Sequence, residues 1–166
     1  MCFRTLSYDY PNHGLKLDFE VIHIYNFLET EIGKGGVAFK DIKKSATYQD
    51  SCRLSRFDDR ADLPRKLIKR LNNGNFNEMS ESGRSAICCG NSAWVGCDSF
   101  SKALQVKRLK QAKSNGSNLI ITSCPKCQVH LKCAMEDPFL GNEIKVDIED
   151  LTSASQKYIL EIEIRQ

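Results

Sequence analysis

Apolar residues recur every three to four positions in several segments, which is the pattern of helices with one buried face. Between Asp18 and Gly33 this spacing predicts a helix that begins near Asp18, although the alternation from Leu15 to Val21 would also suit a strand. Most later segments also have typical helix-starting residues, aspartate or proline, or typical helix-ending residues, asparagine or glycine. The further predicted helices are 62–71, 98–113, a helix that begins at Pro125, and 153–162.

Short segments between these helices are predicted to be strands. The predicted strands are 45–49, 84–87, 118–123 and 144–148, with 76–80 either an edge strand or a loop. The run 118–123 has the character of a strand covered on both faces. Because strands alternate with helices, we expect an α/β fold, with a doubly wound, mostly parallel sheet and helices on both faces.

The composition is that of an ordinary soluble globular protein. The chain has 166 residues, 41% of them hydrophobic and 27% charged, with a formal net charge of +3. This length suffices for one domain with a real core. We expect that domain to span 17–166, after an irregular N-terminal arm of residues 1–16. The basic residues are spread along the chain, so nucleic-acid binding has little support.

The sequence also bears on location. No apolar run approaches the ~20 residues that cross a bilayer, and the first residues lack the long apolar segment of a signal peptide. We therefore expect no transmembrane segment and a cytoplasmic protein. In that compartment the eight cysteines should be thiols or metal ligands rather than disulfides.

Five of the cysteines lie at a distinctive spacing. Thirty-five residues separate Cys52 from Cys88-Cys89-Gly90, and 33 more precede Cys124-Pro125-Lys126-Cys127. Thiolates select iron–sulfur clusters, zinc or copper over hard cations. Adjacent cysteines suit one tetrahedral ion poorly, since zinc ligands are usually two to four residues apart, so the spacing favours a cluster. All three cysteine groups are predicted to follow the carboxyl ends of strands, where open α/β sheets bind ligands.

The whole array resembles the cysteine-rich CCG domain found in heterodisulfide reductase and in the iron–sulfur subunits of glycolate, lactate and anaerobic glycerol-3-phosphate dehydrogenases. The likeness extends from about Val21 to Phe139. It includes Tyr48-Gln49-Asp50-Ser51-Cys52-Arg53-Leu54, where the family usually has Tyr-His-Asp-Pro-Cys-His-Leu, and also Pro64-Arg65, Gly116 and 120–125. The resemblance implies a noncubane [4Fe-4S] cluster, with zinc as the alternative. The implied ligands are Cys52, Cys88, Cys89, Cys124 and Cys127.

The resemblance implies an iron–sulfur subunit of a heterodisulfide-reductase-like oxidoreductase, which uses the cluster for electron transfer or disulfide reduction. Two alternatives stay open: the iron–sulfur subunit of a flavin-dependent hydroxy-acid dehydrogenase, and a non-catalytic zinc-binding or assembly domain. The replacements Gln49, Ser51 and Arg53 around the first cysteine favour the last of these. Relatives usually carry the motif twice, so we expect a ferredoxin-like iron–sulfur or flavin subunit as partner. The sequence assigns no catalytic residue.

The other candidate residues are expected to have structural or surface roles. Arg53 is either solvated or offsets cluster charge, and Trp94 is expected to narrow the surface beside the cluster or to anchor a partner. The expected packing, surface or capping residues are Cys2, Cys97, Cys133, His13, His23 and His130. The expected solvated basic face of the 98–113 helix comprises Lys102, Lys107, Arg108, Lys110 and Lys113.

Overall fold

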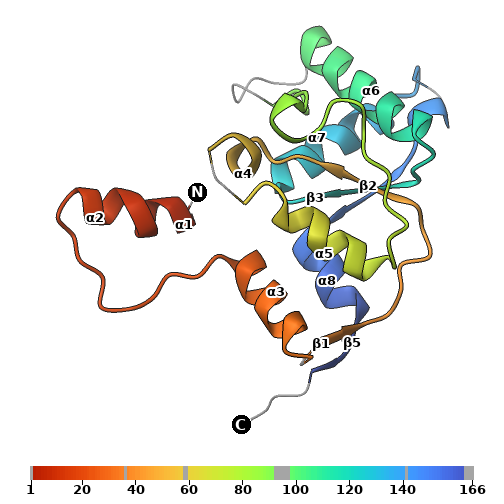
Figure 1. Ribbon diagram of the computed structural model, residues 1–166. Coiled ribbons are helices and arrows are strands. Elements are labelled where there is room, and N and C mark those ends of the chain that lie inside the picture. The colour runs from red at the N-terminus through yellow and green to blue at the C-terminus, as the bar shows by residue number, and fades with distance from the viewer. Residues whose placement is uncertain (1, 36, 58–59, 92–97, 141, 163–166) are drawn as a thin grey trace.

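Three parallel strands form the centre of the fold (Figure 1). The computed structural model describes residues 2–35, 37–57, 60–91, 98–140 and 142–162. Strands β2 (Ala46–Gln49), β3 (Leu119–Thr122) and β4 (Asp147–Asp150) pair in parallel in that order. Because Gln49 pairs with Thr122, the segments that follow β2 and β3 leave the sheet side by side. The predicted parallel sheet is confirmed.

Helices cover both faces of this sheet, as predicted (Figure 1). Successive side chains of a strand point to opposite faces, so Ile121 packs with Leu67 on one side and Ile120 packs with Leu109 on the other. The first face is covered by α3 (Ile24–Gly33), α4 (Cys52–Phe57), α5 (Leu63–Leu71) and α8 (Leu151–Tyr158), and the second by α6 (Ser99–Ser114) and α7 (Pro125–Met135).

Side chains that accept hydrogen bonds from the first turn fix where several helices begin. His23 Nδ1 accepts from the Tyr25 amide at 3.2 Å, so α3 begins at Ile24. The prediction of a start near Asp18 was wrong. Asp98 caps α6 and Asp150 caps α8 in the same way. Among the described helices, none is both long and apolar enough to cross a membrane.

A second, two-stranded sheet joins distant parts of the chain. β1 (Val37–Phe39) pairs antiparallel with β5 (Ile159–Ile162). The predicted helix 153–162 is therefore wrong at both ends, because α8 begins at Leu151 and the chain turns into a strand after Tyr158. The predicted strand 144–148 is also shifted, since Ile144 belongs to a helical turn and β4 begins at Asp147. In both cases pairing with another strand decides the boundary.

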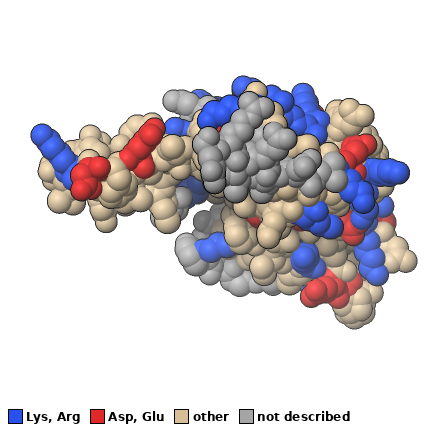
Figure 2. Space-filling view, turned by 90° about the horizontal axis from the view of Figure 1, so that it is seen from below, with Lys and Arg blue, Asp and Glu red and all other residues tan. Residues whose placement is uncertain are grey.

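The N-terminal arm is helical where an irregular segment was expected. It consists of α1 (Cys2–Arg4), a π-helical turn (Thr5–Asp9) and α2 (Tyr10–Asn12). Figures 1 and 2 show the arm projecting from the body of the molecule. Its α1 end is held by the Phe3 ring, which lies 4.2 Å below the Arg60 guanidinium and beside His23. The arm is thus anchored at one end, next to α3 and α4.

Candidate metal centre

The five cysteines of the array lie on three segments, two of which follow strands as predicted. Cys52 is the first residue of α4, just after β2, and its side chain is exposed. Cys124 follows β3 at the start of α7, and Cys127 is buried in the first turn of that helix. These two segments therefore lie at the carboxyl edge of the sheet, where such folds bind ligands.

The adjacent cysteines are reached differently, since the predicted strand 84–87 is wrong. Residues Gly83–Ser85 form a 3-10 turn, and the chain then runs as a loop into Cys88 and Cys89. Side chains take the place of strand partners there: Arg56 donates to the Ala86 carbonyl at 2.7 Å, and Gln49 to the Ile87 carbonyl at 3.5 Å. Because these carbonyl groups already accept hydrogen bonds from side chains, this segment needs no neighbouring strand to satisfy them.

The five cysteines are neighbours linked in pairs. Cys127 is hydrogen-bonded through its side chain to both Cys89 and Cys124. Cys88 interacts electrostatically with both Cys89 and Cys52. In addition, Cys52, Cys88, Cys89 and Cys127 line one small cavity. The structure therefore brings together every cysteine that the sequence pattern selected.

The thiols differ in acidity because they share hydrogen bonds unequally. The pKa of Cys124 is lowered chiefly by the hydrogen bond from Cys127, and further by the backbone amides of Cys127 and Lys126 at the start of α7. Donating to Cys124 and Cys89 raises the pKa of Cys127, and burial raises that of Cys88. Metal binding requires deprotonated thiols, and the amide groups at this helix start favour the negative charge that results.

In this structure Cys127 is hydrogen-bonded to Cys89 and Cys124, and the thiols do not surround a common centre. Within the described ranges, no three His, Cys, Asp or Glu side chains have the arrangement of a metal-ion site. Each thiol would have to lose its proton before this set could act as metal ligands. Its chemistry nevertheless suits a soft metal centre, since five sulfurs from three segments are gathered beside a helix N-terminus.

Gly90 allows α6 to approach the cysteine loop closely. Its φ is +86°, and a Cβ at this position would lie 2.6 Å from the Ser101 carbonyl oxygen of α6. Glycine alone combines a positive φ with so short an approach. The glycine that follows the two cysteines is therefore required by the packing of the loop against α6.

A buried ion pair ties the loop to the end of β2. Both Asp50 oxygens accept from Arg65 at 2.8 Å, and Asp50 also accepts from the Gly83 amide at 2.9 Å. The Asp50 side chain is 1% exposed and that of Arg65 13%. Asp50, two residues before Cys52, thus links the first cysteine segment to the loop that carries Cys88.

Sequence reasoning missed the role of Arg108. It was expected on a solvated basic face, but it is fully buried in α6 and contacts Gln49. The signal was its place on one helical face with Ser101, Gln105 and Ala112, all of which are buried. Lys107 and Lys110 are exposed, as expected.

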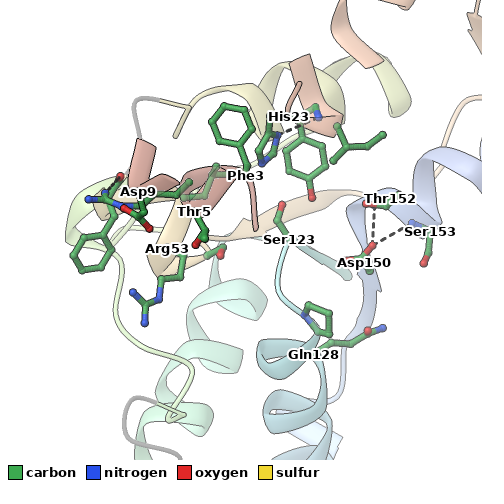
Figure 3. A pocket seen from close by; sticks show the side chains of 17 residues that line it. Phe3, Thr5, Asp9, His23, Arg53, Ser123, Gln128, Asp150, Thr152 and Ser153 are labelled. Carbon is green, nitrogen blue, oxygen red and sulfur yellow. Dashed lines mark hydrogen bonds between the residues drawn. The ribbon is translucent and has the colours of Figure 1, made fainter. Parts of the chain in front are cut away.

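A large pocket lies beside the cysteines (Figure 3). Its volume is about 890 Å³, and residues next to the ligand candidates form part of its wall: Ser51, Arg53, Ser123, Pro125 and Gln128. Figure 3 shows Phe3 and Thr5 of the arm on one side and Ser123 and Asp150 on the other. The pocket is therefore bounded by the arm and by the sheet edge that carries Cys52 and Cys124.

The remaining candidates lie away from the thiols or have other contacts. Arg53 is exposed, with its guanidinium 5.4 Å from the Phe57 ring centre. His23 is a helix cap, as expected, and His130 Nδ1 lies 3.3 Å from the Gln105 amide nitrogen. Cys2 is exposed, and none of the described cysteines forms a disulfide. Cys97 and Trp94 lie outside the described residues.

Comparison with known proteins gives the family. The profile of a cysteine-rich domain, CCG, matches residues 46–132, which contain all five cysteines of the array. The chain belongs to this family. The resemblance inferred from the sequence is confirmed, and no solved structure matches the chain.

Curated relatives of this CCG chain include subunits of known reductases. It is 31% identical over 152 residues to a fumarate reductase (CoM/CoB) subunit from Methanothermobacter marburgensis, covering 90% of this chain and 30% of that protein. It is 33% identical over 134 residues to a dihydromethanophenazine:CoB--CoM heterodisulfide reductase subunit from Methanosarcina barkeri, covering 78% and 33%. A probable iron-sulfur-binding oxidoreductase of Bacillus subtilis, FadF, is 25% identical over 158 residues, covering 92% and 22%. The chain thus spans about a third or less of these relatives.

Proposed function

We propose that this CCG chain is the cluster-binding part of an iron–sulfur subunit in a heterodisulfide-reductase-like oxidoreductase. The ligands would be Cys52, Cys88, Cys89, Cys124 and Cys127, around a [4Fe-4S] cluster of the noncubane type. The observation that carries the proposal is the convergence of five thiols from three segments, linked through Cys127 on one side and Cys88 on the other.

The two adjacent cysteines support a cluster over a single zinc ion. Cys89 is hydrogen-bonded to Cys127, while Cys88 lies within range of the charge of Cys52. The two adjacent cysteines thus interact with different members of the other three. One tetrahedral zinc ion would use only some of these five thiols. A cluster with several metal atoms could be bound by both adjacent cysteines at once.

The pocket supports a reaction with a small molecule beside the cluster. When bound, such a cluster supplies electrons one at a time to an adjacent group, such as a disulfide. This chain would hold the substrate between Ser51 and Arg53 on one wall and Ser123 and Pro125 on the other, next to Cys52 and Cys124. The exposed Cys52 lies at the solvent side of the cysteine site.

Partners would supply the electrons. The aligned regions cover only 30% and 33% of the two relatives named as reductase subunits, and we propose that the chain acts with a ferredoxin-like iron–sulfur or flavin subunit in the cytoplasm. A hydroxy-acid dehydrogenase complex would use the same cysteine site with a different flavin partner.

Metal analysis tests the proposal. Protein purified without oxygen should contain iron and acid-labile sulfide, and Cys88→Ser or Cys89→Ser should lose both, because hydroxyl is a poor ligand for soft metals. The control is the double variant Cys2→Ser, Cys133→Ser, which should keep its full metal content. Stoichiometric zinc without sulfide would instead support a zinc-binding assembly domain. Unchanged iron in both single variants would refute the ligand set.

A further inference from the structure

Arg108 is a buried cation, and no carboxylate of the described residues lies at hydrogen-bond distance from it. Its Nε donates to Gln49 Oε1 at 2.5 Å, and its Nη1 donates to the Glu81 carbonyl at 2.5 Å and to Gln111 Oε1 at 2.8 Å. All three acceptors are neutral. Its Nη2 is buried and has no hydrogen-bond partner among the described residues.

Such an arrangement is costly unless something nearby offsets the charge. Burial lowers the pKa of Arg108 to about 10, although the carboxylates of Asp50, Glu81 and Glu78 oppose the shift at longer range. Asp50 is already engaged by Arg65, and Glu81 interacts with Lys107 and Gln111. The local carboxylates therefore leave the charge of Arg108 only partly compensated.

Gln49 connects this cation to the cysteine site. Its amide accepts from Arg108 and donates to the Asp50 carbonyl at 3.1 Å and the Ile87 carbonyl at 3.5 Å. Gln49 also lines the small cavity with Cys52, Cys88, Cys89 and Cys127. One side chain thus separates the guanidinium of Arg108 from the cavity of the thiols, and the same side chain holds the residue before Cys88.

We propose that Arg108 is the buried counter-charge of the cysteine site: a positioning residue that offsets the negative charge of the thiolate-bound cluster and, through Gln49, holds the loop carrying Cys88 and Cys89. This inference rests on the proposed function. A positive charge in a low-dielectric interior interacts strongly with the site. The positive charge of Arg108 would stabilise the reduced cluster, which is more negative than the oxidised one. It would therefore raise the reduction potential of the cluster.

The test compares reduction potentials in variants that differ in charge. Arg108→Gln removes the charge but keeps hydrogen-bonding groups, whereas Arg108→Lys keeps the charge. Lys110→Gln is the matched control, because it removes an exposed cation from the same helix. Each protein is purified anaerobically, its fold checked by far-UV circular dichroism, and its iron and sulfide counted before a redox titration monitored by visible and electron paramagnetic resonance spectra.

We expect a more negative midpoint potential in Arg108→Gln, together with several-fold faster loss of sulfide in the presence of a chelator. Arg108→Lys should lie closer to wild type than to Arg108→Gln, and Lys110→Gln should match wild type. A merely structural role would alter stability in both Arg108 variants without this dependence on charge. An Arg108→Gln potential equal to that of wild type would overturn the inference.

If Arg108→Gln does not fold, Gln49→Met is compared with the double variant Gln49→Met, Arg108→Met. Removing both partners of a buried hydrogen bond avoids leaving one of them unsatisfied. The difference in reduction potential between the two variants therefore measures the effect of the Arg108 charge. A more negative potential in the double variant supports the inference, and equal potentials overturn it. A wild-type protein without iron and sulfide would instead show that the proposed function itself fails.

Discussion

Replacing Gly90 with alanine tests the close packing of the cysteine loop against α6. At φ +86°, alanine would be strained, and its Cβ would lie 2.6 Å from the Ser101 carbonyl oxygen and 3.2 Å from Gln105 Cγ. The Gln105 side chain can move away, but the Ser101 carbonyl belongs to the first turns of α6. Either the helix or the loop must therefore shift.

The expected loss has two parts. A left-handed conformation costs a residue with a Cβ about 1–2 kcal/mol relative to glycine. Overpacking of a well-packed site adds about 1–3 kcal/mol. Gly90→Ala should therefore lower the free energy of unfolding by roughly 2–5 kcal/mol, a large share of the roughly 5–15 kcal/mol that stabilises a typical domain.

Gly74→Ala provides the matched control. Gly74 follows the end of α5 with φ +81°, and a Cβ there would meet no atom within 4 Å. This variant carries the conformational cost without the clash, so it should lose only about 1–2 kcal/mol. The difference between the two variants then isolates the contact with Ser101.

Urea unfolding followed by far-UV circular dichroism measures both variants, after the same treatment with chelator and reductant. Iron content of the untreated proteins gives a second readout, because a displaced loop would move Cys88 and Cys89. Equal destabilisation by the two substitutions, with equal iron content, would refute the argument that α6 requires glycine at this position.

Two further predictions concern polar contacts around the site. Asp50→Asn should lower the free energy of unfolding in urea by about 2–3 kcal/mol, because it breaks the buried pair with Arg65 and leaves that cation with the more exposed Glu78; a loss below about 0.5 kcal/mol would contradict this. The pKa of Asp98 is lowered by hydrogen bonds from the Ser101 amide and hydroxyl. Its capping contribution should be present above the ordinary carboxyl pKa of about 4 and be lost as the pH falls through the lower folded value. Asp98→Ala should accordingly lower the melting temperature at neutral pH, with a difference that shrinks toward pH ~3; a constant difference would count against the cap.

The parts of the fold that could be predicted are those that local sequence specifies. Strands β2 and β3 are buried over their whole length, and Asp98 and Pro125 mark helix starts that the structure retains. Each of these signals acts within a few residues. Where a long-range partner sets the boundary, as for β5 and its pairing with β1, local periodicity gave the wrong element.

The candidate site divides in the same way. The spacing of five cysteines determined which side chains belong together, because so many soft ligands in one family pattern have few other uses. The tertiary structure decided how they meet. Side chains from β2 and α4, rather than a neighbouring strand, donate hydrogen bonds to the loop before Cys88. The close packing of α6 against Gly90 fixes the conformation of the loop after Cys89.

Arg108 shows the limit most clearly. The sequence determined that α6 is a helix rich in basic residues, and a basic residue on a helix is usually solvated. Whether one of them is buried depends on which face of α6 meets Gln49 and the cysteine loop, and those contacts join residues 59 positions apart. Hydrogen bonding and desolvation at that distance are properties of the folded chain, so only the tertiary structure could place this charge beside the cysteine site.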